Sequence, residues 1–144
     1  MGIVYRGGSI FTSTAHVLAV PVNCQGITGC GLALQFRERF PHWYGAYRQC
    51  CIDGLLQVGR PFLHWGDEPW ILSFPTKRDW RLPSELVFLE AGLAATVPLC
   101  TRHGVESIAF PKLGTGAGGL SWDKVRPLME AYLDGQPWEV YIYV

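Results

Sequence analysis

Two glycine-rich segments of this sequence have the composition of anion-binding loops. The first, Asn23–Gly31, reads NCQGITGCG and follows the apolar run Val17–Asn23, and the second, Pro111–Leu120, reads PKLGTGAGGL and follows the apolar run Ile108–Phe110. Each segment leads into a stretch with helical spacing, so free backbone N–H groups and the positive end of a helix dipole would face a ligand together. Two such loops predict a ligand with two phosphates or an extended diphosphate.

Other familiar chemistries are not supported by the remaining residues. The segment Gly114–Gly119 fits GxGxxG, but too little chain follows it for the second half of a dinucleotide-binding fold, and there is no P-loop lysine or GxSxG nucleophile. The four histidines lack metal-ligand spacing, and the five cysteines include no CxxC pair. We therefore expect no metal, no cofactor and no disulfide framework, with Cys24 and Cys30 as small apolar fillers near the ligand.

The composition indicates one globular domain. We expect residues 1–144 to form a single domain, because 144 residues are enough to bury a core. Hydrophobic residues make up 49% of the chain and 12 basic residues balance 12 acidic ones, which argues against a protein that coats nucleic acid through its net charge. The pattern of a secretory leader and apolar runs of membrane-spanning length are both missing, so we expect a cytoplasmic protein with no membrane partner.

Alternating strand and helix patterns must position the two loops. Apolar runs predict strands at 3–5, 17–23, 62–65, 70–74, 108–110 and 138–144. Helical spacing predicts helices at 32–40, 42–52 and 84–103, the last capped by Ser84, and a fourth that begins at Trp122 with Ser121 as its N-cap. This order predicts an α/β fold, a three-layer α/β/α sandwich around a mixed, mainly parallel sheet. Because ligands bind beyond the carboxyl ends of parallel strands, both glycine-rich loops and the polar segment Pro75–Pro83 are expected to converge on one pocket.

Three parts of the sequence together resemble the DarG-like branch of the macrodomain family. They are Val22–Gly26 with Gly29–Ala33, the segment SFPTKRDW at Ser73–Trp80 with LEAGL at Leu89–Leu93, and PKLGTGAGGLSW at Pro111–Trp122. The resemblance spans nearly the whole chain, and the FPTKR segment is quite specific to this branch. It implies a macrodomain fold, ADP-ribose as ligand, and the antitoxin activity that removes ADP-ribose from thymidine bases in DNA modified by a DarT-type toxin.

The resemblance also implies which residues form the site. Lys77 matches the lysine on which catalysis depends in this branch, and Asn23 would hold the distal ribose beside it. The other expected ADP-ribose contacts are Ser9, Ile10, Gly29, Cys30, Gly31, Leu32, Thr76, Leu113, Gly114, Thr115, Gly116, Ala117 and Gly118. Arg78, Trp80 and Arg81 form a basic and aromatic cluster that we expect as a candidate contact for the DNA.

Departures from the family pattern leave alternatives open. Ser9 stands where macrodomains usually carry an Asp or Asn that reads the adenine amino group, and Gly118 stands where the branch acting on glutamate carries an Asp. The alternatives are a hydrolase of ADP-ribosylated glutamate or aspartate in proteins and a non-catalytic ADP-ribose-binding module. Lys77 could act as a covalent nucleophile or as a charge stabiliser. The C-terminal region with which full-length DarG engages the toxin is not evident, so direct toxin binding is not expected.

Overall fold

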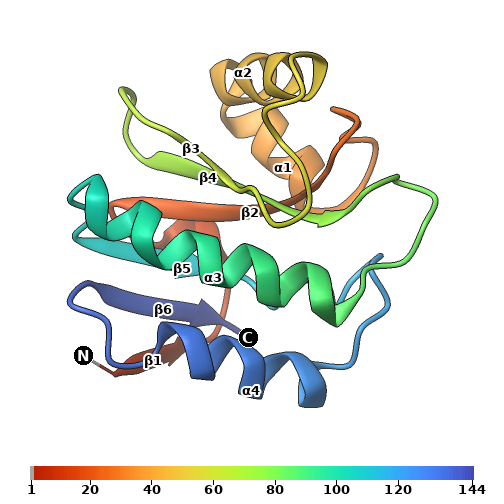
Figure 1. Cartoon of the computed structure of the whole chain (residues 1–144). Helices are drawn as coiled ribbons and strands as arrows, with labels where there is room; N and C mark the ends of the chain where they lie inside the picture. Colours follow the sequence, from red (N-terminus) through yellow and green to blue (C-terminus); the bar gives the residue numbers. More distant parts are fainter. Residues whose placement is uncertain (1) are drawn as a thin grey trace.

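The computed structural model describes residues 2–144 and consists of one mixed sheet with helices on both of its faces (Figure 1). The strands are β1 (Ile3–Arg6), β2 (Val17–Asn23), β3 (Phe62–His64), β4 (Trp70–Lys77), β5 (Ser107–Phe110) and β6 (Glu139–Tyr143). The helices are α1 (Gly31–Arg39), α2 (Pro41–Ile52), α3 (Leu86–Arg102) and α4 (Trp122–Leu133), with a short 3-10 turn, η1, at Ile10–Thr12.

The sheet has the strand order β1-β6-β5-β2-β4-β3, in which β3 and β4 form an antiparallel hairpin and every other pair is parallel. Parallel neighbours need crossover connections, and here these place α1 and α2 on one face and α3 and α4 on the other. The predicted three-layer α/β/α sandwich is confirmed. No helix in residues 2–144 is long and apolar enough to cross a membrane.

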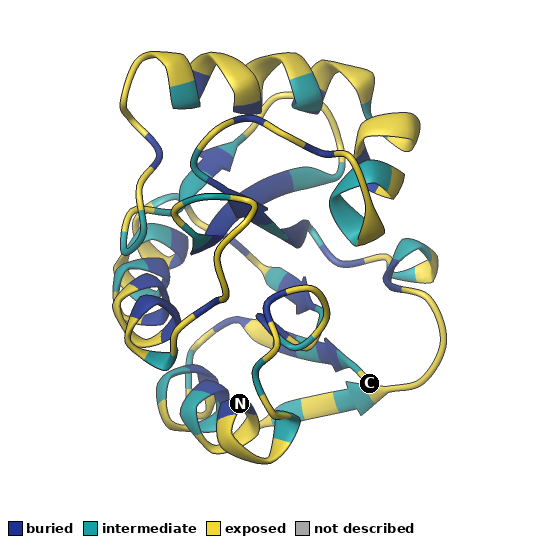
Figure 2. Ribbon diagram, turned by 90° about the vertical axis from the view of Figure 1, so that its right-hand side faces the viewer, coloured by how far each residue is buried: buried dark blue, intermediate teal, exposed yellow. Residues whose placement is uncertain are grey.

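The central strand β2 is buried on both faces, which explains its nearly continuous apolar sequence. Val17 and Ala19 belong to the core cluster beneath α3 and α4, whereas Leu18, Val20 and Val22 belong to the cluster beneath α1 and α2. Figure 2 shows this arrangement as buried strands between helices whose outer faces are exposed. The strand therefore provides a rigid base for the loop that follows it.

A glycine sets the distance between α3 and β4. Gly92 is buried, and a Cβ atom added to it would lie 2.5 Å from Cζ of Phe74 in β4. Any larger residue would therefore push the helix away from the strand that carries Lys77. This close approach gives a physical reason for the glycine in the LEAGL segment.

Two predicted boundaries differ from the structure by more than one residue. Strand β4 continues past Phe74 to Lys77, because Phe74 and Pro75 still pair with β2. Helix α3 begins at Leu86 with Glu85 as its N-cap, so Ser84 does not cap it and lies buried instead. Ser121 is the N-cap of α4 as predicted, although its side chain makes no capping hydrogen bond.

Candidate active site

A cavity of about 380 Å³ lies beyond the carboxyl ends of β2, β4 and β5. The first glycine-rich loop, the end of β4 with the residues after it, and the second glycine-rich loop all contribute to its lining. The convergence predicted for the three segments is therefore confirmed. Among the predicted site residues, those that line the cavity are Asn23, Gly29, Cys30, Gly31, Leu32, Thr76, Lys77, Trp80, Gly114, Thr115, Gly116, Ala117 and Gly118.

Five predicted site residues do not line this cavity. Ile10 and Leu113 are buried in the two core clusters, and the Ser9 hydroxyl accepts a hydrogen bond from the Phe11 N–H as the N-cap of η1. The two others are Arg78, whose guanidinium lies 4.8 Å from the ring centroid of Phe88, and Arg81, which pairs with Asp79.

Other lining residues were missed by the sequence prediction. Lys112 brings an exposed positive charge to the second loop, and Tyr143 brings an aromatic ring from the end of β6. Ile27 adds an exposed apolar side chain to the first loop. The last strand was predicted, but its parallel pairing with β5, which brings Tyr143 to the same edge of the sheet, could not be read from the sequence.

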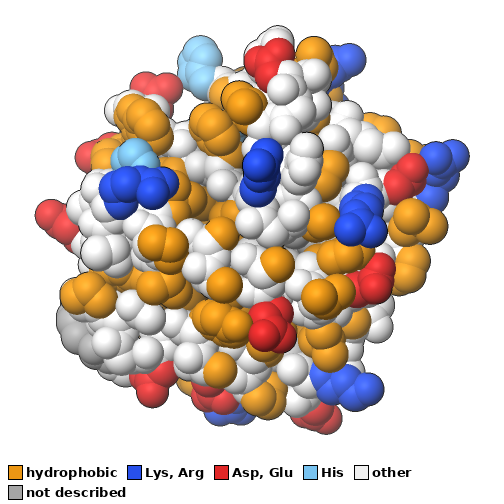
Figure 3. All heavy atoms as spheres, in the orientation of Figure 1, with side chains coloured by type: hydrophobic (Ala, Val, Ile, Leu, Met, Phe, Trp, Pro, Cys, Tyr) orange, Lys and Arg blue, Asp and Glu red, His pale blue; other side chains and the backbone are white. Residues whose placement is uncertain are grey.

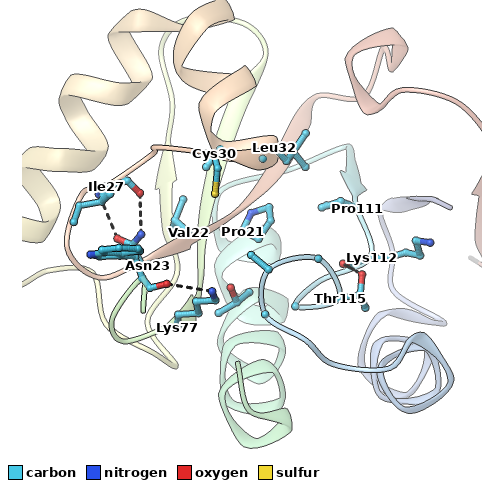
Figure 4. A pocket seen from close by; sticks show the side chains of 18 of the residues that line it. Pro21, Val22, Asn23, Ile27, Cys30, Leu32, Lys77, Pro111, Lys112 and Thr115 are labelled. Carbon is cyan, nitrogen blue, oxygen red and sulfur yellow. Dashed lines mark hydrogen bonds between the residues drawn. The ribbon is translucent and has the colours of Figure 1, made fainter. Parts of the chain in front are cut away.

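The polar side chains divide between two sides of the cavity (Figure 4). Asn23 and Lys77 come from neighbouring strands on one side, while Pro111, Lys112 and Thr115 lie on the other. Cys30 and Leu32 lie along the upper edge of this view, with the Cys30 sulfur pointing toward the cavity. The only two ammonium groups of the lining are therefore separated, one at each side.

The Asn23 side chain organises the first loop. Its Oδ1 atom accepts hydrogen bonds from the N–H groups of Gln25 at 3.0 Å and Ile27 at 3.3 Å and from the Tyr47 hydroxyl at 3.0 Å. Its Nδ2 atom donates to the Ile27 carbonyl at 2.8 Å. The oxygen is thus fully occupied, and the second Nδ2 hydrogen is the group left for a ligand.

A strand irregularity brings Lys77 beside Asn23. Val22 pairs with Pro75, but the next residue of β2, Asn23, pairs with Lys77, so Thr76 is the extra residue of a β-bulge. The Lys77 ammonium donates a hydrogen bond of 3.4 Å to the carbonyl oxygen of Trp80. The lysine is therefore half-buried at the cavity edge with a single backbone acceptor.

The second glycine-rich loop presents unused backbone donors. The N–H groups of Gly116, Ala117 and Gly118 make no hydrogen bond within residues 2–144, while the Gly119 N–H closes a turn onto the Gly116 carbonyl. A run of free N–H groups lining a cavity is an anion-binding arrangement. Across from this loop, α1 begins at Gly31 without a side-chain cap, so its first N–H groups also remain available.

Gly118 has no room for a side chain. A Cβ atom added there would overlap both the hydroxyl oxygen of Ser84 and the carbonyl oxygen of Gly114. The Ser84 N–H also donates to the Gly118 carbonyl at 3.0 Å, so Ser84 holds the second loop from beneath. The absence of an acid at this position is thus built into the backbone of the loop.

Of the two cysteines in the first loop, Cys24 is half-buried and Cys30 is exposed at the cavity. The Cys24 thiol donates a hydrogen bond of 3.4 Å to the Lys77 carbonyl, and burial raises its pKa above the usual value, which keeps it a neutral thiol. All five cysteines are free. No group of three or more His, Cys, Asp or Glu residues that could hold a metal ion exists in the part of the chain that the structure describes.

Comparison with known proteins places the chain in a family. The Macro domain family model matches residues 19–129. The structure matches the macrodomain of *Thermus aquaticus* DarG with a TM-score of 0.93 and 37% identity, covering 99% of this chain and 97% of that one. It also matches the *Thermosipho africanus* DarTG structure in complex with ADP-ribose, with a TM-score of 0.88 and 34% identity, covering 96% of this chain and 41% of that one.

A curated relative points the same way. The DNA ADP-ribosyl glycohydrolase of *Mycobacterium tuberculosis* is 36% identical over 128 residues, which cover 86% of this chain and 36% of the relative. The chain spans well under half the length of such relatives. The chain belongs to the macrodomain family, in its DarG-like branch.

Proposed function

We propose that this protein is an ADP-ribosyl hydrolase that releases ADP-ribose from thymidine bases in DNA. One observation carries the proposal: the bulge in β4 brings Lys77 beside Asn23 at one side of a cavity whose opposite side offers free backbone N–H groups. Phosphate-binding groups at one side and a positively charged side chain at the other suit an ADP-ribosyl group bound with its reacting carbon at Lys77.

The ligand is oriented by the chemistry of the lining. The diphosphate would bind between the N-terminus of α1 and the free N–H groups of Gly116–Gly118, with Lys112 adding a positive charge. The distal ribose would receive a hydrogen bond from Nδ2 of Asn23. The adenine end would then face Tyr143, whose ring can stack on a base.

Cleavage breaks the bond between the C1″ carbon of the distal ribose and a thymine nitrogen. The bond's electron pair stays with the base, C1″ acquires oxocarbenium character, and water adds to C1″ while its proton goes to the base or to solvent. In our proposal the Lys77 ammonium stabilises the negative charge that develops on the departing thymine. The glycine loop contributes by positioning, because Gly118 leaves no space for an acid that could activate water.

Two exposed apolar side chains line the same cavity as Lys77. Trp80 is 53% exposed and Ile27 is 43% exposed, and both line the cavity. An exposed indole is a stacking surface for an unpaired base. The chain balances 12 basic residues with 12 acidic ones, and both kinds are interspersed on the face that Figure 3 shows. We therefore expect affinity for DNA to depend on this local contact and not on the net charge.

The similar proteins support the choice of DNA as the substrate carrier. Four curated relatives named as DNA ADP-ribosyl glycohydrolases, one of them fused to a DNA ADP-ribosyl transferase, are 35% to 37% identical to this chain. The chain corresponds to only 36% to 40% of their length, and we therefore propose, by similarity, that it shares their activity. Five free cysteines are in keeping with action in a reducing compartment such as the cytoplasm.

A two-substrate assay tests the function. The protein is incubated separately with an oligonucleotide ADP-ribosylated on thymidine and with a protein ADP-ribosylated on glutamate, and released ADP-ribose is measured by mass spectrometry. We expect release from the oligonucleotide at a rate well above that from the protein. Faster release from the glutamyl ester would support a protein hydrolase, and release from neither substrate, with ADP-ribose still bound in calorimetry, would support a binding module.

A further inference from the structure

One side chain outside the cavity ties two of its loops together. The Gln25 amide nitrogen donates to Oδ2 of Asp79 at 3.0 Å, and the Gln25 amide oxygen accepts a hydrogen bond from the Trp80 N–H at 3.0 Å. Gln25 belongs to the first glycine-rich loop and its two partners belong to the segment that follows Lys77. Both functional groups of one amide are thus used on a loop more than fifty positions away.

The Asp79 carboxylate that accepts from Gln25 is itself held in place by Arg81. Arg81 donates to both of its oxygens, through Nε at 3.0 Å and through a terminal nitrogen at 2.8 Å, and the Arg81 N–H adds a third bond of 2.9 Å. The hydrogen bonds from Arg81 hold the pKa of Asp79 well below its usual range, so it stays an ionised acceptor at neutral pH. The Leu82 N–H donates to the Asp79 carbonyl at 3.0 Å and closes a turn.

Trp80 is consequently held at both ends of its backbone. Its N–H donates to Gln25, and its carbonyl oxygen accepts the hydrogen bond from the Lys77 ammonium. The backbone of this one residue thus carries the exposed indole and also supplies the acceptor for the Lys77 ammonium. Removing the Gln25 amide would leave the Trp80 backbone N–H without its acceptor. It would also break the link between the segment that follows Lys77 and the first glycine-rich loop.

We propose that Gln25 is a positioning residue for the reaction: it fixes the loop that carries Trp80 against the Asn23 loop, and so sets the place of the indole and of the Lys77 ammonium relative to C1″. This inference deepens the proposed function and rests on it. Because Gln25 does not line the cavity, its loss should slow cleavage while leaving the affinity for free ADP-ribose unchanged.

The test compares Gln25→Ala with Gln49→Ala. Gln49 is a matched control because its amide also donates to an aspartate at 3.0 Å, Asp53, on the exposed surface of α2 and away from the cavity. Gln25→Ala is expected to lower kcat/KM on the substrate that the wild type cleaves by about tenfold, as the loss of two hydrogen bonds that order a loop implies. The Kd of Gln25→Ala for ADP-ribose should equal that of the wild type. Gln49→Ala should equal the wild type in both kcat/KM and Kd.

A charge exchange separates positioning from a general loss of structure. In Gln25→Glu the new carboxylate faces the Asp79 carboxylate, so cleavage should slow. Adding Asp79→Asn supplies an amide that can donate to the glutamate, and the double variant should recover the rate of Asp79→Asn alone.

Amide exchange followed by NMR gives a readout independent of activity, because Gln25→Ala should speed exchange of the Trp80 backbone N–H.

The outcomes also distinguish this inference from the proposed function. If the wild type cleaves modified DNA and Gln25→Ala is equally fast, or if the Trp80 N–H exchanges at the same rate in both, the role of Gln25 is overturned and the function stands. If the wild type cleaves only the glutamyl ester and Gln25→Ala slows that reaction, the DNA substrate is wrong and the role of Gln25 stands. If the wild type cleaves neither substrate, both are overturned.

Discussion

Asn23 and Lys77 are direct neighbours across the parallel strands β2 and β4, and they meet only because Thr76 is skipped in the pairing. Without the bulge, Asn23 would pair with Thr76, and Lys77 would lie one position further along β4. Pro75, which precedes Thr76 in β4, has no N–H to donate to a regular ladder of hydrogen bonds, and this favours a bulge at the next residue. The pairing places Asn23, which orders the first glycine-rich loop, beside Lys77, the residue that we propose acts at C1″.

Substitution of Asn23 by Asp tests the loop network. The change keeps the Oδ1 acceptor but replaces Nδ2, which donates to the Ile27 carbonyl at 2.8 Å, by a second oxygen. That oxygen would repel the carbonyl, and it has no hydrogen to offer the ribose. We expect the free energy of unfolding to fall by about 1–3 kcal/mol and ADP-ribose binding to weaken at least tenfold. Chemical denaturation and calorimetry measure the two effects, and wild-type affinity in this variant would place the ribose elsewhere.

Tyr47→Phe is the companion variant, because it disturbs the same network from behind the cavity. The Tyr47 hydroxyl lies 2.8 Å from the Asn23 carbonyl oxygen and 3.0 Å from Oδ1, and it is buried. Its removal should lower stability by about 1–3 kcal/mol while leaving the Nδ2 donor in place, so ADP-ribose affinity should fall less than in Asn23→Asp. An equal loss of affinity in both variants would contradict a separate role for Nδ2.

Gly118→Ala tests the fit of the second loop. The added Cβ would overlap Ser84 and the Gly114 carbonyl, so the loop must shift and its free N–H groups must lose their alignment. We expect about 1–3 kcal/mol of destabilisation and a clear loss of ADP-ribose affinity. Gly45→Ala is the matched control, because Gly45 lies in α2 with open space around its added Cβ, and its substitution should preserve or slightly raise stability.

Much of the fold follows from local sequence patterns. Residues 17–23 were predicted as a strand and form β2 with the same bounds, because a run of apolar side chains suits a strand buried on both faces. The helix start at Trp122 also follows from residue type. These features depend on neighbours in the chain, which the sequence displays directly.

What could not be predicted depends on contacts between distant segments. Proline at position 75 indicates a strand end, yet β4 continues to Lys77 because it pairs with β2 on one side of the sheet. Ser84 has the residue type of a helix cap, but it is buried beneath Gly118. The hydrogen bonds that link Gln25 to Asp79 and Trp80 join two loops that are more than fifty positions apart, so no local sequence pattern indicates them.

His64 predicts a dependence of stability on pH. It is hydrogen-bonded to the Ser73 hydroxyl at 2.9 Å, and burial lowers its pKa from 6.5 to about 4. Below pH 6.5 the unfolded chain takes up a proton at this histidine while the folded chain does not, so stability falls as the pH drops toward 4. The loss attributable to His64 approaches about 3 kcal/mol at the lower end of this window.

The His64 effect is measured by urea denaturation at pH 7 and pH 4.5. His64→Gln removes the titrating group and should show a smaller decrease in stability between the two pH values than the wild type. His42→Gln, which changes an exposed histidine, should keep the wild-type decrease. If all three proteins lose the same stability, the buried histidine is not the source.

Trp80→Ala tests the proposed contact with the base. The indole is 53% exposed at the cavity, whereas Trp65 is 59% exposed and lies outside its lining, which makes Trp65→Ala a matched control. Loss of one stacked base is expected to raise KM for the modified oligonucleotide about tenfold or more without changing the Kd for free ADP-ribose. Equal KM values for the two tryptophan variants would remove Trp80 from the DNA contact.

The most direct test of the central claim is the release of ADP-ribose from a thymidine-modified oligonucleotide by the wild type, Lys77→Ala and Lys124→Ala. Lys124 is an exposed lysine of α4 outside the cavity and serves as the control. We expect release by the wild type and by Lys124→Ala, and no release by Lys77→Ala, which should still fold and bind ADP-ribose. Release by Lys77→Ala at the wild-type rate, or no release by the wild type, would contradict this claim.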